Sequence, residues 1–75
     1  MKDSINLLDT VALTVDVPAR GLVRGEVGTV VEVLAPNVFE VEFSGDDGRT
    51  YAEFSIGRDD LIHLHNRGKA LRLAA

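Results

Sequence analysis

The sequence is as informative for what it lacks as for what it contains. It has no cysteine, which excludes a disulfide framework and a thiolate metal site. No apolar run approaches the ~20 residues of a membrane-spanning helix, and the first nine residues lack the apolar core of a signal peptide. We therefore expect a cytoplasmic protein that has no membrane partner.

Positive charge is also scarce. Eight Lys and Arg residues stand against 12 Asp and Glu, which gives a formal net charge of −4. General binding to a phosphate backbone depends on clustered Lys and Arg, so this balance argues against a nucleic-acid partner. A protein partner with a basic surface is the better match.

The chain has 75 residues, 45% of them hydrophobic, which is enough for one globular domain. A domain of this size buries only ~60% of the surface that its unfolded chain exposes. The core therefore has little volume for an enclosed substrate pocket. We expect a protein that is not an enzyme and that holds no cofactor.

Alternating apolar and polar residues predict a series of short strands. The organising stretch is 24–34, in which two glycines bracket Glu26-Val27 and a valine-rich segment follows. The stretch 38–43 has the clearest alternation, with its apolar residues inward and its glutamates in water. The predicted strands span residues 9–15, 27–34, 38–43, 49–56 and 61–65.

The sequence also predicts which side chains face the core. In the first strand Val11, Leu13 and Val15 should share one face. In the third, Phe39, Val41 and Phe43 should point inward, and Phe54 should join them from the fourth. In the last strand we expect Ile62 and Leu64 inward, with His63 and His65 exposed.

Proline, glycine and aspartate mark the connections. Pro18 and two glycines break the chain within 16–25, which predicts a long loop with room for one helical turn. Pro36-Asn37 and Asp47-Gly48 predict tight hairpin turns, and residues 56–60 a single helical turn.

This order of elements predicts an all-β fold, a small SH3-like barrel of five antiparallel strands. The barrel and its N-terminal lead-in should occupy residues 1–66. A basic tail follows over 67–75, with Arg67, Lys69 and Arg72 and no acidic side chain. The tail could pack on the barrel, pair as an extra strand or stay loose. The sequence leaves the oligomeric state open.

Residues 8–65 resemble a KOW-type element, in which a strand, a Gly-x-x-Gly turn and a valine-rich strand recur. The motifs Leu-Asp-Thr-Val, Arg-Gly-x-x-Gly-Thr-Val-Val-Glu, Val-Glu-Phe and Asp-Gly-Arg-Thr resemble those of a family of short bacterial proteins of unassigned function. They begin at Leu8, Arg24, Val41 and Asp47. Some members of that family lie beside toxin-like genes, which implies an antitoxin-like or regulatory role. The Arg-Gly-x-x-Gly-x-Val stretch is also similar to the SH3-like domain of nitrile hydratase β subunits, which would imply an accessory role to a metalloenzyme.

Four glutamates should lie on the outward faces of successive strands: Glu32, Glu40, Glu42 and Glu53. They could form an acidic patch that docks a basic partner. They could equally be the solvated face that keeps a small protein soluble. Tyr51 is the one aromatic residue expected on a binding surface, and Arg20 and Arg24 belong to the long loop beside it.

The alternative is a KOW-like module that binds RNA or associates with ribosomes, in which Arg20, Arg24 and Arg49 would contact phosphate.

We expect no metal site, because His63 and His65 share a face without the third ligand that zinc requires. We expect no catalytic residue, because no serine has the setting of an activated nucleophile. The sequence thus favours a non-enzymatic protein-binding module.

Overall fold

The computed structural model describes residues 4–64, and it is all-β. Five strands form one antiparallel sheet in the order β4-β3-β2-β1-β5. This confirms the predicted all-β fold with five antiparallel strands. Two 3₁₀ turns interrupt the strand sequence, at the positions where single helical turns were predicted. The elements are β1 (Thr10–Leu13), η1 (Pro18–Arg20), β2 (Val27–Ala35), β3 (Val38–Ser44), β4 (Thr50–Gly57), η2 (Arg58–Asp60) and β5 (Leu61–His63).

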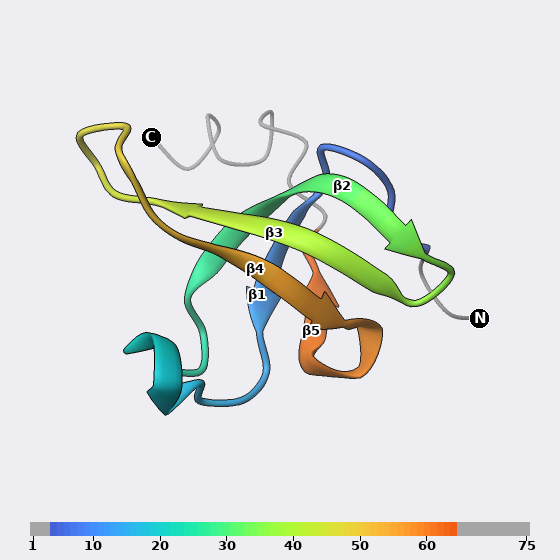
Figure 1. Cartoon of the computed structure of the whole chain (residues 1–75), viewed down its shortest axis with the longest axis horizontal. Coiled ribbons are helices and arrows are strands. Elements are labelled where there is room, and N and C mark those ends of the chain that lie inside the picture. Colours follow the sequence, from blue (N-terminus) through green and yellow to red (C-terminus); the bar gives the residue numbers. More distant parts are fainter. Residues whose placement is uncertain (1–3, 65–75) are drawn as a thin grey trace, which may run out of the picture.

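The sheet curls because β2 serves two neighbours in succession. Its first residues pair with β1 and its later ones with β3, and Thr29 pairs with both Thr10 and Glu42. In Figure 1, β3 and β4 therefore run in front while β1 and β5 cross behind them at a steep angle. Within residues 4–64 the ladder stays open, with β4 and β5 as its two edges. The result is a barrel-like sheet with one unpaired seam.

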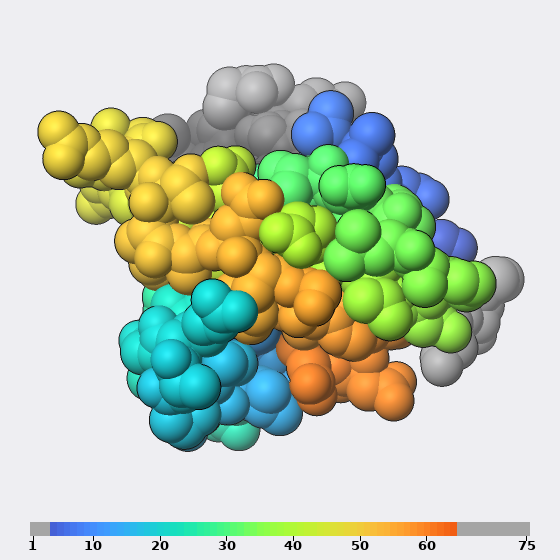
Figure 2. All heavy atoms as spheres, in the orientation of Figure 1, coloured from blue at the N-terminus to red at the C-terminus, as the bar shows by residue number. Residues whose placement is uncertain are grey.

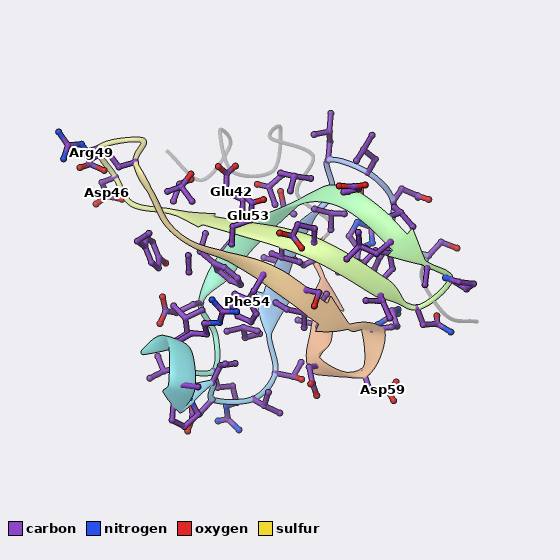
Figure 3. The ribbon with its side chains drawn as sticks, in the orientation of Figure 1. Glu42, Asp46, Arg49, Glu53, Phe54 and Asp59 are labelled. Atoms are coloured by element: carbon purple, nitrogen blue, oxygen red, sulfur yellow. The ribbon has the colours of Figure 1, made fainter. Side chains whose placement is uncertain are left out.

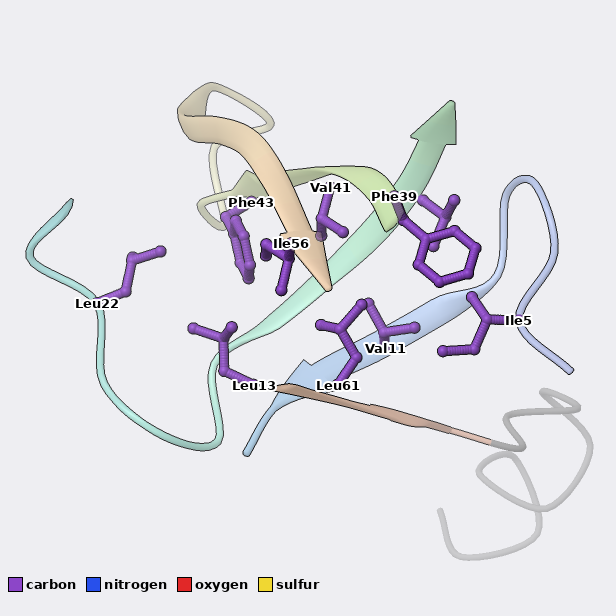
Figure 4. Close-up of a cluster of buried hydrophobic side chains, with 10 residues drawn as sticks. Ile5, Val11, Leu13, Leu22, Phe39, Val41, Phe43, Ile56 and Leu61 are labelled. Carbon is purple, nitrogen blue, oxygen red and sulfur yellow. The ribbon is translucent and has the colours of Figure 1, made fainter. Parts of the chain in front are cut away.

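The core lies between the two curled halves (Figure 4). Val11 and Leu13 of β1 face Val41 and Phe43 of β3, as the alternation predicted, and each is at most 2% exposed. The N-terminal segment contributes one side chain and the long loop another. The remaining buried members of the cluster are Ile5, Leu22, Val30, Phe39, Ile56 and Leu61.

Two glycines allow the turn into β2 to pass close to the rest of the sheet. Gly25 has φ of +97°, a conformation that costs other residues energy. Gly28 is buried against β3, and a Cβ atom there would lie 2.7 Å from Val41 Cγ1 and 2.8 Å from Glu42 O. Gly28 therefore permits the close approach of the β2 and β3 backbones.

β2 departs from simple alternation at two bulges. Its register with β3 shifts between Val30 and Glu32 and again between Val33 and Ala35. Each bulge adds a residue to one strand and so changes which side chains face the core. Alternation alone predicts one face with Val27, Thr29, Val31 and Val33 and another with Gly28, Val30, Glu32 and Leu34. This assignment is wrong beyond Val30, because the bulges shift the register.

Two other inward assignments were wrong. Val15 lies beyond the end of β1 and is exposed, because the strand ends at Leu13 and the chain turns into the loop. In β5 the buried residue is Leu61, whereas Ile62 is 53% exposed. His63 therefore lies on the inner side of β5, partly covered, and not on the outer side. His65 and the tail lie outside the described residues.

Candidate functional site

The four predicted surface glutamates converge on the outer side of β2, β3 and β4. The strand registers place Glu32 directly opposite Glu40, and Glu42 directly opposite Glu53. Figure 3 shows Glu42 and Glu53 close together, on the other side of the sheet from the core. We call this set of four, Glu32, Glu40, Glu42 and Glu53, the acidic outer face.

Local structure explains why all four side chains share one face. Glu40 and Glu42 alternate with the buried Phe39, Val41 and Phe43, so the pleat of β3 directs them outward. Glu32 would face inward if β2 continued the alternation of Gly28 and Val30, and the bulge at Val31 reverses it. An irregularity in the strand thus completes the acidic outer face.

The electrostatics of the acidic outer face are unfavourable to folding. Like charges directly opposite each other in an antiparallel pair repel, and this face contains two such pairs side by side. Partial loss of water around the carboxyl group of Glu53 raises its pKa above the ordinary 4.5. A hydrogen bond with Glu40 and the negative charges of Glu40, Glu42 and Glu32 raise this pKa further.

No basic side chain of residues 4–64 forms an ion pair with these glutamates. Glu42 accepts a hydrogen bond from the hydroxyl of Thr50, a neutral donor. Arg49 instead approaches Asp47 in the β3–β4 turn, with Nε and Oδ2 3.8 Å apart. The acidic outer face is therefore a concentration of one sign of charge, without a compensating cation from the described chain.

Tyr51 does not belong to this face. The β3–β4 register shifts between Phe43 and Ser44, so Tyr51 is the extra residue of a bulge. Its ring centroid lies 6.4 Å from that of the buried Phe43. Its hydroxyl donates to Glu26 Oε1 at 2.8 Å. The expectation that Tyr51 is exposed is confirmed at 52%, but it faces the loop before β2 and not the acidic outer face.

Arg20 lies in the same neighbourhood as Tyr51. Its guanidinium carbon sits 4.5 Å from the centroid of Phe54, a cation–π contact. Phe54 is half-buried and stacks on Phe43 with centroids 5.8 Å apart. The prediction that Phe54 packs with the core is confirmed, although Arg20 covers its outer side. We call Arg20, Glu26, Tyr51 and Phe54 the loop–aromatic cluster.

The hydrogen bond of Tyr51 also affects its ionisation. Because the hydroxyl donates to the Glu26 carboxylate, the pKa of Tyr51 is raised above 10.0. Partial loss of water and the negative charge of Glu26 act in the same direction. The other carboxylate oxygen of Glu26 accepts from the backbone N–H of Val23 at 2.8 Å. Glu26 thereby ties the long loop to β4.

The long loop is held at several further points. Val17 and Leu22 form a two-hydrogen-bond bridge, and the buried side chain of Leu22 anchors the loop in the core. The backbone N–H of Arg24 donates to Asp16 Oδ1 at 2.8 Å. Arg24 also lines a hollow together with Thr14, Val15 and Asp16. Figure 2 shows the 18–24 part of the loop (cyan) packed below β4.

The seven predicted site residues thus divide into two groups. The structure brings Glu32, Glu40, Glu42 and Glu53 together, while Arg20, Arg24 and Tyr51 belong to the loop side. Sequence reasoning missed Glu26, because an isolated glutamate before a strand gives no signal of its tyrosine partner. It also missed the contact between His63 and Asp9, whose Nε2 and Oδ2 atoms are 3.3 Å apart.

The remaining surface offers little chemistry. A hollow of about 360 Å³ lies between the N-terminal segment, the β2–β3 turn and Arg58. Within residues 4–64, no three His, Cys, Asp or Glu side chains are grouped so that they could hold a metal ion. The same part of the chain contains no helix of the length and apolarity needed to cross a membrane.

Comparison with known proteins gives one match. A family model described as "Domain of unknown function (DUF4926)" matches residues 7–63, which is most of the chain. No curated protein matches, and no solved structure matches. The resemblances to SH3-like barrels, KOW elements and nitrile hydratase therefore remain predictions.

Proposed function

We propose that this chain, which belongs to the DUF4926 family, is a non-enzymatic protein-binding module whose acidic outer face docks a positively charged protein surface. The observation that carries the proposal is the direct opposition of glutamates, Glu32 to Glu40 and Glu42 to Glu53. A solvated strand face needs polar residues, and threonine or alternating charges would supply them without repulsion.

The geometry indicates what kind of surface would fit. Neighbouring strands are ~4.8 Å apart and alternate residues of one strand ~6.8 Å apart, so the four carboxylates form a compact quadrilateral. Two or three Lys or Arg side chains from one partner segment could each approach two carboxylates. Such pairing would relieve the repulsion in the free protein, and it would speed association at low ionic strength.

The finer parts of the proposal come from the sequence resemblance. The strand order, the long loop after β1 and the 3₁₀ turn before β5 support an SH3-like assignment. The partner would be the product of a neighbouring gene in the cytoplasm, which the chain would neutralise or regulate in an antitoxin-like manner. Copurification with the adjacent gene product is the direct test of that identity.

The described structure gives the RNA-binding alternative little support. Arg20 lies over the ring of Phe54, and Arg49 lies beside the carboxylate of Asp47. Each guanidinium group therefore already has a partner within the chain. Arg24 is the remaining candidate for a phosphate contact. The acidic outer face would repel a phosphate backbone approaching from its side.

The proposal can be tested by titrating the full chain with two labelled probes, a lysine-rich decapeptide and a single-stranded RNA decamer. We expect micromolar binding of the peptide at low salt, weakening steeply as ionic strength rises. The E42Q/E53Q variant should lose about tenfold in affinity, or ~1.4 kcal/mol. Binding of the RNA instead of the peptide would overturn the proposal and favour the alternative.

A matched control separates the site from overall charge. The D46N/D59N variant removes the same number of negative charges from two exposed residues in the β3–β4 turn and in η2, outside the acidic outer face (Figure 3). We expect its affinity for the peptide to change by less than about twofold. Equal losses in the two variants would show that net charge alone attracts the peptide, which would contradict a site at the acidic outer face.

A further inference from the structure

We infer that the partner docks as an extended segment, which adds a strand to the free edge of β4. This inference rests on the proposed function and names the backbone conformation of the partner. Within residues 4–64, β4 is one end of the five-stranded ladder, and Figure 1 shows no strand beside it on the side away from β3. An edge strand presents unpaired backbone N–H and C=O groups, which are the groups that bind an extended peptide.

The register identifies the backbone groups that face this edge. The N–H of Arg58 donates to Asn37 O at 2.8 Å, so in the adjacent pair, Gly57 with Val38, the backbone groups point out of the ladder. Pairing continues without a register shift along β4 as far as the bulge at Tyr51, and the two kinds of pair alternate. The outward groups are therefore the N–H groups of Glu53, Ser55 and Gly57 and the C=O groups of Glu53 and Ser55.

These groups are accessible in the free protein. Glu53, Ser55 and Gly57 are all exposed, and no other backbone group of residues 4–64 bonds to their outward N–H groups. Backbone groups without a partner are almost never buried, because burial without a hydrogen bond is costly. The long loop approaches this strand through Arg20, an exposed side chain that lies over the ring of Phe54.

The opposite edge of the sheet is a poorer site for strand addition. β5 has only three residues. The N–H of Thr14 donates to Asp60 O at 2.9 Å, so the backbone groups of Leu61 point away from β1. Arg58 Nη1 donates to this outward Leu61 O at 3.2 Å. β4 has eight residues and neither of the two residue types, proline and lysine, that commonly block an edge.

The side chains of β4 define the chemistry of the added segment. Residues directly opposite each other in a strand pair share a face. A residue opposite Glu53 lies on the outer side, where Lys or Arg fits, and a residue opposite the half-buried Phe54 lies on the inner side, where an apolar residue fits. The occupant is thus a segment of another protein in which basic and apolar residues alternate. A second copy is disfavoured, because each copy carries a formal net charge of −4.

The test titrates the full chain at low salt with ten-residue peptides in which Lys and Val alternate. A bound strand with its lysines on the outer side directs the lysine backbone N–H groups towards β4 and the valine N–H groups away from it. N-methylation of the lysine backbone nitrogens should therefore weaken binding about tenfold. The matched control, N-methylated at the valines, has the same charge and length and should bind within about twofold of the unmodified peptide.

Hydrogen exchange measured by NMR locates the added strand. With the Lys–Val peptide at saturation, exchange at the N–H groups of Glu53, Ser55 and Gly57 should slow by about tenfold or more, while Phe54 and Ile56, already paired with β3, should change little. If the three outward N–H groups stay unprotected in the complex, the inference is overturned. Protection that arises without peptide and grows with protein concentration would make a second copy the occupant, which also overturns it.

A variant of β4 tests the same edge from the side of the protein. Ser55→Pro removes one outward N–H and no ladder hydrogen bond, and proline is accepted on edge strands. We expect it to weaken binding of the Lys–Val peptide about tenfold, whereas Ser55→Thr, which keeps the N–H, should bind as the unmodified chain does. If Ser55→Pro does not fold, the N-methylated peptides decide the question.

A neutral peptide in which Thr and Val alternate separates this inference from the proposed function. If N-methylation of the lysines leaves binding unchanged, the inference is overturned, while a loss in E42Q/E53Q still supports the proposed function. If the Thr–Val peptide binds as tightly as the Lys–Val peptide and N-methylation of its threonines weakens it, strand addition stands and the proposed function fails. If no peptide binds, both are overturned.

Discussion

The loop–aromatic cluster packs on the inner side of β4, whereas the acidic outer face lies on the outer side of β2, β3 and β4. The two regions differ in how their charged groups are paired. In the cluster, Arg20 rests on a ring and Glu26 accepts from a tyrosine hydroxyl and a backbone N–H. On the acidic outer face, glutamates oppose glutamates. Charged groups in the cluster therefore stabilise the fold, whereas those on the acidic outer face oppose it.

This contrast shows how to weigh exposed charges in a small domain. A charged residue with a matched neighbour is explained by stability alone. A set without matched neighbours, placed where repulsion is greatest, is better explained by something that binds there. By this criterion Arg20 and Tyr51 have a structural explanation, and the acidic outer face does not.

The largest effect on stability should come from Gly28, which packs against Val41, Glu42 and Phe43 of β3. The Gly28→Ala substitution places a Cβ atom 2.7 Å from Val41 Cγ1 and 2.8 Å from Glu42 O, so β2 and β3 must separate. We expect a loss of about 2–3 kcal/mol in the free energy of unfolding, measured by urea denaturation. Gly57→Ala is the control, because its Cβ would meet only Asn37 O at 4.0 Å, and it should be nearly neutral.

Tyr51→Phe should destabilise the protein through the loop–aromatic cluster alone. The substitution keeps the ring beside Phe43 and removes the hydrogen bond to Glu26. We expect a loss of about 0.5–1 kcal/mol, because the hydrogen bond is exposed to water. An unchanged free energy of unfolding would show that the long loop is held by Leu22 and the backbone bonds without this contact.

A titration gives independent evidence on the same contact. Tyr51 is the only tyrosine of the chain, so ultraviolet absorbance between pH 8 and 12 reports its ionisation directly. The midpoint should lie above 10.0, and Glu26→Gln should lower it. Because the pKa of Tyr51 is raised in the folded state, this contribution to stability is present below pH 10 and is lost as the pH rises through the folded pKa.

Glu53→Gln should give the smallest effect, and of opposite sign. The pKa of Glu53 is raised in the folded state, so its carboxyl group favours folding when protonated and loses that contribution as the pH rises through the folded pKa. At pH 7 the substitution removes a charge from a repulsive set, and Tm should rise by about 1–4 °C. The gain should disappear as the pH falls below 4.5. A lower Tm at pH 7 would contradict mutual repulsion among the glutamates of the acidic outer face.

Much of this architecture was predictable from alternation and turn residues. Phe39, Val41 and Phe43 point inward as predicted, because a strand with one buried face has a strict period of two. The turns at Pro36-Asn37 and Asp47-Gly48 close the two hairpins that their residues predict. The convergence of the four glutamates was also predicted as a shared outward face.

The errors trace to features that change the period. The bulge at Val31 reverses the faces of β2, and the bulge at Tyr51 takes that ring away from the acidic outer face. A bulge depends on the pairing of two strands, so a pattern within one strand does not reveal it. β5 is only three residues long, and its register with β1 decides that His63 faces inward and Ile62 outward.

The pairing of the first strand with the last has a consequence for how the protein folds. The β2–β3–β4 hairpins join segments close in sequence, so their loops close rapidly. The β1–β5 ladder joins opposite ends of the domain, and its loop-closure entropy is the largest of any strand pair. During synthesis a ribosome must therefore release nearly the whole domain before β5 can pair with β1. Until then, the apolar side of the hairpins stays exposed to solvent.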